Sequence, residues 1–204
     1  MGKVVREVYF FDEPGEQNTD DVVEAVAKRV EAGGIGHVIV ASTSGETATR
    51  FAKALEGKAK IFCVSEAPYR REWNEEWPCL KPRYREELEK LGVTIIDRVS
   101  YVFHSSVLEN AKLEGVAPEQ LVKETLYSLG QGLKVAVEVV LIAVSQGYVE
   151  PYQDVIGVGG SGEGADTAAV IHATYPAQIF HKESGKRLEI REIIAMPYRK
   201  KWWE

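Results

Sequence analysis

A hydroxyl-rich segment gives the most specific chemical signal in the chain. Residues 37–41 form a short apolar run of the kind found in buried parallel strands, and residues 48–55 have apolar side chains at helical spacing. The segment between these elements and into the first helical turn is Ser42, Thr43, Ser44, Gly45, Glu46 and Thr47. The first N–H groups of a helix lack internal partners and carry partial positive charge, so a phosphate group fits there. An ordinary helix cap explains one hydroxyl but not four, and we therefore predict a phosphate site.

A glycine cluster gives the second signal, since five of the eight residues from 157 to 164 are glycine. Gly157, Gly159 and Gly162 formally match G-x-G-x-x-G, but the motif lies late in the chain and no clear helix follows, which argues against a dinucleotide site. Backbone N–H groups of such a turn can face an anion without obstruction, whereas a tight turn needs only two or three glycines. We expect a second wall of the ligand site at Gly159, Gly160, Ser161, Gly162, Gly164, Asp166 and Thr167.

The connection from residue 65 to residue 81 is long for a segment between a strand and a helix. It contains Tyr69, Arg70, Arg71, Trp73 and Trp77. These side chains could form a lid that stacks on a planar ring and pairs with charge. The equally weighted alternative is that the tryptophans pack on the body of the protein or on a partner subunit.

Candidates for catalysis are few. His104 follows a predicted strand, and we expect it to contact the ligand or cap its loop, because a dyad with the adjacent Ser105 has poor geometry. Cys63 lies within an apolar strand and is interpreted as a packing residue. Glu138 lies on an apolar helix and needs a partner. The histidines and cysteines show no spacing typical of metal ligands, so no metal site is predicted.

The predicted strands and helices alternate along the chain, and they carry the loops that contain the candidate site residues. Strands are predicted at residues 4–11, 37–41, 60–64, 93–96 and 154–158, with two late strands at 167–174 and 188–195 that we expect to be antiparallel. Thr19 is expected to cap a helix that contains Val22, Val26 and Val30. This alternation predicts a mainly parallel sheet covered on both faces, in one domain spanning residues 1–204, with ligands at the carboxyl ends of the strands.

One long helix is predicted from residue 118 to residue 146, with a bend at Gly130 and Gly132. Its second half, residues 135–144, is apolar almost all round. Such a helix is deeply buried or lies at a subunit interface, and we expect the protein to form a homo-oligomer.

Composition limits the class of protein. The 204 residues include 45% hydrophobic residues, and the net charge is −6, which argues against a general nucleic-acid binder. The longest apolar stretch is much shorter than the roughly 20 residues that span a membrane, and the first residues lack a hydrophobic signal region. Two cysteines cannot form a disulfide framework. We expect a soluble, cytoplasmic protein with a full-sized core.

The two loops resemble those of a known family. Residues 38–48 are similar to the phosphate-binding segment of the C-terminal α/β domain of pyruvate kinase, which binds allosteric sugar phosphates in some kinases. Residues 13–19 and 159–168 resemble more specifically a stand-alone archaeal and bacterial family with this fold, and the resemblance covers residues 9–197. It implies a three-layer α/β/α sandwich. The catalytic activity of pyruvate kinase belongs to a barrel domain for which this chain has no room, so that activity is not implied.

The resemblance also implies that flavin mononucleotide (FMN) is bound in the cleft. By position, Thr43, Ser44, Gly45, Glu46 and Thr47 would hold the phosphate, and residues 160–167 would line the opposite wall. The residue pattern itself supports only a phosphate-bearing ligand. The leading hypothesis is therefore an FMN-binding protein, either a redox enzyme or a flavin carrier. The second is a regulatory domain for a sugar phosphate or nucleotide without chemistry, and a phosphate-transferring enzyme ranks last because no P-loop lysine occurs.

Overall fold

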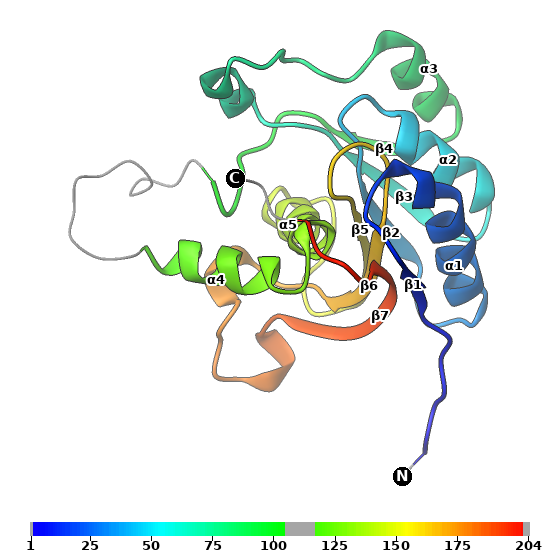
Figure 1. Cartoon of the computed structure of the whole chain (residues 1–204), viewed down its shortest axis with the longest axis vertical. Helices are drawn as coiled ribbons and strands as arrows, with labels where there is room; N and C mark the ends of the chain where they lie inside the picture. Colours follow the sequence, from blue (N-terminus) through cyan, green and yellow to red (C-terminus); the bar gives the residue numbers. More distant parts are fainter. Residues whose placement is uncertain (1, 105–116, 202–204) are drawn as a thin grey trace.

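A computed structural model describes residues 2–104 and 117–201. Within these residues, seven strands form one sheet in the order β1-β7-β6-β5-β2-β3-β4 (Figure 1). The strands are β1 (Tyr9–Phe11), β2 (His37–Ala41), β3 (Lys60–Val64), β4 (Thr94–Ile96), β5 (Asp154–Gly159), β6 (Thr167–His172) and β7 (Glu189–Pro197). Strand β6 is antiparallel to both of its neighbours, and the other neighbouring pairs are parallel. The carboxyl ends of six strands therefore lie at one edge of the sheet.

Helices cover both faces of the sheet. The α-helices are α1 (Thr19–Glu31), α2 (Glu46–Ala54), α3 (Pro82–Lys90), α4 (Pro118–Tyr127) and α5 (Gln131–Ser145), and the short 3₁₀ turns are η1 (Glu16–Asn18), η2 (Pro68–Trp73), η3 (Pro176–Gln178) and η4 (Ser184–Lys186). Figure 1 shows α1, α2 and α3 on one face of the sheet and α5 on the other, with α4 beside it. This arrangement is the predicted three-layer α/β/α sandwich.

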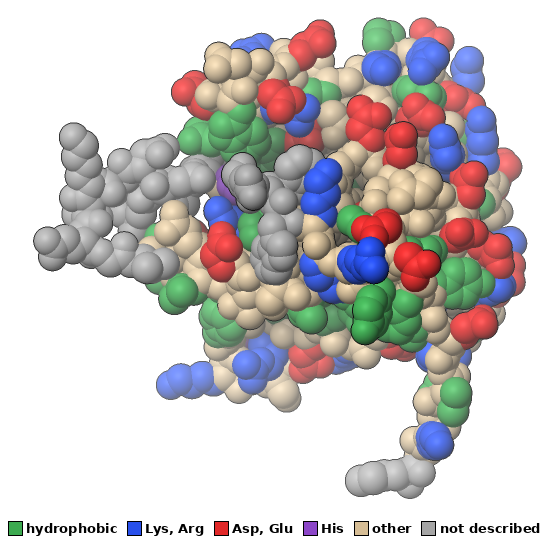
Figure 2. Space-filling model, viewed as in Figure 1, with side chains coloured by type: hydrophobic (Ala, Val, Ile, Leu, Met, Phe, Trp, Pro, Cys, Tyr) green, Lys and Arg blue, Asp and Glu red, His purple; other side chains and the backbone are tan. Residues whose placement is uncertain are grey.

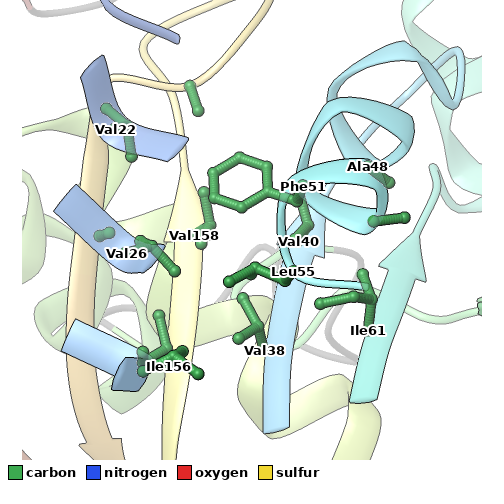
Figure 3. Close-up of a cluster of buried hydrophobic side chains, with 14 of the residues drawn as sticks. Val22, Val26, Val38, Val40, Ala48, Phe51, Leu55, Ile61, Ile156 and Val158 are labelled. Carbon is green, nitrogen blue, oxygen red and sulfur yellow. The ribbon is translucent and has the colours of Figure 1, made fainter. Parts of the chain in front are cut away.

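Successive side chains of the central strands point to opposite faces of the sheet, so the hydrophobic core has two parts. Val38 and Val40 of β2 pack with α1 and α2, whereas Ile39 between them packs with α5. Figure 3 shows Phe51 of α2 and Leu55, the residue that follows α2, over these valines, together with Ile156 and Val158 of β5. Because both faces of these strands are buried, their sequences are continuous apolar runs, and such runs predict central parallel strands correctly.

The predicted long helix is two helices. Gly130 has a φ of 111°, a backbone conformation that other residues rarely adopt, and it separates α4 from α5. Helix α5 lies centrally on the sheet, and residues 132–134 and 136–144 are buried within the chain. Burial inside one chain therefore explains why α5 is apolar almost all round. Formation of a homo-oligomer stays a prediction, but the apolar surface of α5 is no longer an argument for it.

A buried ion pair within α5 includes the carboxylate that binds the segment after β4. The ammonium of Lys134 pairs with the carboxylate of Glu138, and both side chains are almost completely buried. Glu138 also accepts hydrogen bonds from the backbone N–H groups of Val102 and Phe103, both at 2.9 Å. The expectation that Glu138 needs a partner on this apolar helix is therefore met by Lys134. Breaking such a pair on one side would leave a buried charge uncompensated.

Two glycines of the cluster allow α5 to approach the sheet closely. A Cβ atom on Gly157 would lie 2.5 Å from the carbonyl oxygen of Ala136, and one on Gly159 would lie 2.8 Å from the nitrogen of Ala136. Both glycines belong to β5, and α5 covers them. The prediction that Gly159 forms a wall of the ligand site is therefore corrected: its missing side chain serves helix–strand packing.

Two other local predictions were wrong. The first strand begins only at Tyr9, and Val4 and Val5 are exposed on a segment that runs away from the body of the molecule (Figure 1). Thr19 does not cap α1, whose N-cap residue is Asn18. The hydroxyl of Thr19 instead donates to the carbonyl oxygen of Glu16 and accepts from the N–H of Ala165. The expected antiparallel pairing of the late strands is confirmed by β6.

Replacing Gly159 by alanine tests this packing. Gly159→Ala is expected to lower the free energy of unfolding by about 1–3 kcal/mol, because the added methyl group meets the α5 backbone. Gly36→Ala is the matched control, since a Cβ atom there meets no atom within 4 Å. Urea denaturation measures both variants. Equal stability of the two variants would contradict the packing role of Gly159.

Candidate ligand-binding cleft

A cleft of about 930 Å³ opens at the carboxyl edge of the sheet. It lies between the loops that follow β1, β2, β3 and β5 and the first turn of α5. Strands β2 and β5 are neighbours, but the chain leaves β2 through α2 on one face and reaches β5 through α5 on the other. Open α/β sheets bind ligands where the chain direction switches in this way.

The cleft collects part of each predicted loop. From the hydroxyl-rich segment it is lined by Ser42, Thr43, Ser44, Glu46 and Thr47, and from the glycine cluster by Gly160, Gly162 and Gly164. The lining does not include the predicted residues Gly45, His104, Gly159, Ser161, Asp166 and Thr167. The two loops therefore face each other across one cleft, while several of their residues have other roles, and a ligand site there stays a prediction.

The start of α2 is held in a defined geometry. The hydroxyl oxygen of Ser42 accepts the N–H of Ala48 at 3.2 Å, which anchors the strand end to the helix. Gly45 has a φ of 96°, and a Cβ atom there would lie 2.7 Å from Leu80 and Tyr84. Gly45 is thus required for backbone conformation and packing. Thr47, the second residue of α2, lines the cleft, and its hydroxyl has no partner among the described residues.

Asp166 holds the loop after β5, which faces the start of α2 across the cleft, in a fixed position. Its side chain is fully buried and accepts the backbone N–H groups of Gly15 and Ser161, each at 3.0 Å. The hydroxyl of Thr167 donates to its other oxygen at 2.7 Å. Asp166 therefore ties the loop after β1 to the loop after β5. The expectation that Asp166 and Thr167 line the cleft is corrected, because both side chains are buried and neither residue is part of its lining.

The glycines of this loop have structural reasons of their own. A Cβ atom on Gly160 would lie 2.7 Å from the carbonyl oxygen of Gly164, within the same loop. Gly164 has a φ of 74°, and a Cβ atom there would meet Thr19 and Glu16. These two glycines are needed for the closure of the loop and for its packing on η1. Only at Gly162, where a Cβ atom meets nothing within 4 Å, does the loop leave open space.

Glu66 joins three loops at the edge of the cleft, and no sequence pattern singled it out. Its carboxylate accepts the hydroxyl of Thr43 at 2.9 Å, pairs with Arg70 at 3.1 Å and accepts the hydroxyl of Tyr101. Burial, followed by the charge of Glu66, raises the pKa of Tyr101 above its ordinary value. A glutamate after a strand resembles an ordinary solvated residue, and only the fold shows that the ends of β2, β3 and β4 converge on it.

The aromatic residues of the long connection pack on the body of the protein. Trp73 stacks on Tyr101 with ring centroids 5.5 Å apart, and Tyr69 and His104 each meet Trp73 edge-on. The indole N–H of Trp77 donates to the carbonyl oxygen of Glu66. Within the described residues, no aromatic side chain lines the cleft. His104 thus belongs to this aromatic cluster instead of contacting the cleft, and Ser105 and Ser106 lie outside the described residues.

A family model provides an independent comparison. The model of the pyruvate kinase alpha/beta domain matches residues 20–171, which is well over half of the chain. The chain belongs to this pyruvate kinase alpha/beta domain family. The match includes β2 to β6 and therefore both loops that face each other across the cleft.

Charges around the cleft of this pyruvate kinase alpha/beta domain are mostly paired. Arg50 pairs with Asp20 at 3.1 Å and with Glu46 at 3.0 Å. Hydrogen bonds from Tyr84 and Arg50 lower the pKa of Glu46. Figure 2 shows acidic and basic side chains interspersed over the visible face of the helices. Lys81 also lines the cleft, and its side chain makes no ion pair with any described residue.

Other chemistry is limited in the part of the domain that the structure describes. Residues 2–104 and 117–201 contain no group of three His, Cys, Asp or Glu side chains arranged to hold a metal ion. Burial raises the pKa of Cys63 to about 12, so its thiol stays protonated, as expected for a packing residue. No helix among these residues is long and apolar enough to cross a membrane.

The hydrogen bonds by which Asp166 joins the loops after β1 and β5 should contribute to stability. Asp166→Ala removes the shared acceptor of Gly15 and Ser161, and we expect it to lower the free energy of unfolding by about 1–3 kcal/mol, because the buried N–H of Ser161 is left without a partner. Asp12→Ala, at an exposed position in the neighbouring loop, is the control. Thermal unfolding followed by circular dichroism measures the melting temperatures of both variants. Equal melting temperatures would contradict a stabilising role of the hydrogen bonds to Asp166.

Proposed function

We propose that this pyruvate kinase alpha/beta domain binds a phosphate-bearing ligand, with the phosphate at residues 42–47. The observation that carries the proposal is the start of α2 at the switch point between β2 and β5, where the hydroxyl of Thr47 lines the cleft without a partner among the residues that the structure describes. The helix dipole favours an anion there, together with the N–H of Thr47, which has no partner among the described residues, whereas the N–H groups of Glu46 and Ala48 already donate to Ser44 and Ser42. A cleft of about 930 Å³ lies within the usual volume range of roughly 300–1,000 Å³ for small-molecule sites.

FMN is the ligand that we propose first. The donors at the α2 start suit its phosphate, and the acceptors Glu66 and Gln131 on the cleft walls suit the hydroxyl groups of its ribityl chain. Gly162 leaves open space for a flat ring, with Val135 and Ala41 as apolar contacts. When bound, FMN would supply reversible electron transfer. The residues of the chain would bind and orient it.

A sugar phosphate or nucleotide is the second candidate. It is favoured by the polar character of the cleft, in which the described lining includes several glutamates and no aromatic ring. Such a ligand would make the domain a regulatory or binding module. The absorbance spectrum of the freshly purified protein separates the candidates: flavin bands at visible wavelengths support FMN, and a colourless protein that binds phosphate esters supports the second.

A charge introduced at Ser44 tests the phosphate position. Ser44→Asp places a carboxylate at the start of α2 and should weaken the binding of FMN or another phosphate ester at least tenfold, corresponding to about 1.4 kcal/mol, through repulsion. Ser184→Asp, at an exposed position in η4, is the matched control. Titration calorimetry measures both variants. Unchanged affinity in Ser44→Asp, with the fold intact, would place the phosphate elsewhere.

A further inference from the structure

The segment that begins α3 is attached to the start of α2. The backbone N–H of Lys81 donates to the carbonyl oxygen of Ser44 at 3.0 Å. Next to it, Leu80 and Tyr84 pack so closely over Gly45 that a Cβ atom there would lie 2.7 Å from either side chain. Lys81 is the N-cap residue of α3. The main chain therefore holds Lys81 beside the hydroxyl-rich loop, independently of its side chain.

The ammonium of Lys81 differs from the other cations at the cleft. Three cationic residues line it within the described part of the chain, and Arg50 and Arg70 each pair with two carboxylates. Lys81 makes no ion pair with any described residue, and its side chain is exposed. Glutamates outnumber cations in the lining, and Glu16, Glu76 and Glu163 are exposed at its rim. An anionic ligand therefore needs a cation that is not already neutralised.

We infer that Lys81 is the counter-charge of the bound phosphate, and that the cleft selects a terminal phosphomonoester. This inference rests on the proposed function. A phosphomonoester carries about −1.5 to −2 charges at pH 7, and a helix N-terminus supplies about half a positive charge. The α2 start alone leaves most of that charge uncompensated, and the single positive charge of the Lys81 ammonium compensates most of what is left. An internal phosphodiester carries less charge per phosphate and has a substituent on both sides.

The test compares FMN, riboflavin and flavin adenine dinucleotide (FAD), which share the flavin ring but differ in phosphate chemistry. In the wild-type protein, FMN should bind more tightly than riboflavin and FAD, as measured by quenching of flavin fluorescence. Lys81→Met should weaken FMN about 10- to 100-fold, the usual effect of losing a charge-assisted hydrogen bond, and should change riboflavin by less than twofold. Lys81→Arg should keep most of the FMN affinity, since it keeps the charge.

Lys90→Met is the matched control, because Lys90 lies in the last turn of the same helix and does not line the cleft. It makes the same change in net charge and should leave FMN affinity unchanged. Lys81→Met should keep the wild-type melting temperature, because its anchoring bond to Ser44 belongs to the backbone. If the wild-type protein binds inorganic phosphate but not FMN, Lys81→Met must weaken inorganic phosphate by the same factor.

The outcomes separate the two claims. FMN affinity unchanged in Lys81→Met, while FMN still binds more tightly than riboflavin, overturns the role of Lys81 and leaves the phosphate site intact. FAD binding as tightly as FMN overturns the selection of a phosphomonoester. A wild-type protein that binds neither FMN nor inorganic phosphate overturns the proposed function and this inference together.

Discussion

The close contact between α5 and β5 is the constraint on which the cleft depends. It is possible because Gly157 and Gly159 have no side chains where the backbone of α5 crosses the strand. Once α5 is placed, its first turn forms one wall of the cleft, and β5 ends opposite α2. Because β2 and β5 are neighbours whose helices lie on opposite faces, the edge between them remains open, and the cleft forms at that edge.

Three carboxylates, of which Glu138 and Asp166 are buried and Glu66 is partly exposed, then fix the loops around the cleft. Glu138 on α5 holds the segment after β4, whose Tyr101 donates to Glu66. Glu66 in turn binds Thr43 of the hydroxyl-rich loop, and Asp166 ties the loops after β1 and β5. Each carboxylate accepts hydrogen bonds from two or more donors, which offsets the cost of its burial. The walls of the cleft are thus set before any ligand binds, which reduces the ordering that binding requires.

Membership of the pyruvate kinase alpha/beta domain family rests on residues 20–171. The proposed phosphate site lies within this match, at the start of α2, whereas the arrangement of paired and unpaired charges comes from the fold of this chain. Arg50 and Arg70 are committed to carboxylates, so the local electrostatics of the cleft depend on how its charges are paired more than on how many there are.

The sequence by itself determined most of the strands and helices, and the edge of the sheet at which the two predicted loops meet. Continuous apolar runs such as residues 37–41 are typical of strands buried on both faces, and the hydroxyl-rich segment marked the helix start that lines the cleft. The roles of single residues were decided only by tertiary structure. Asp166 lies under its loop, His104 packs against Trp73, and Gly159 faces α5. Periodicity reports which residues share one element, but such contacts join residues far apart in the chain, and only the packing of elements brings them together.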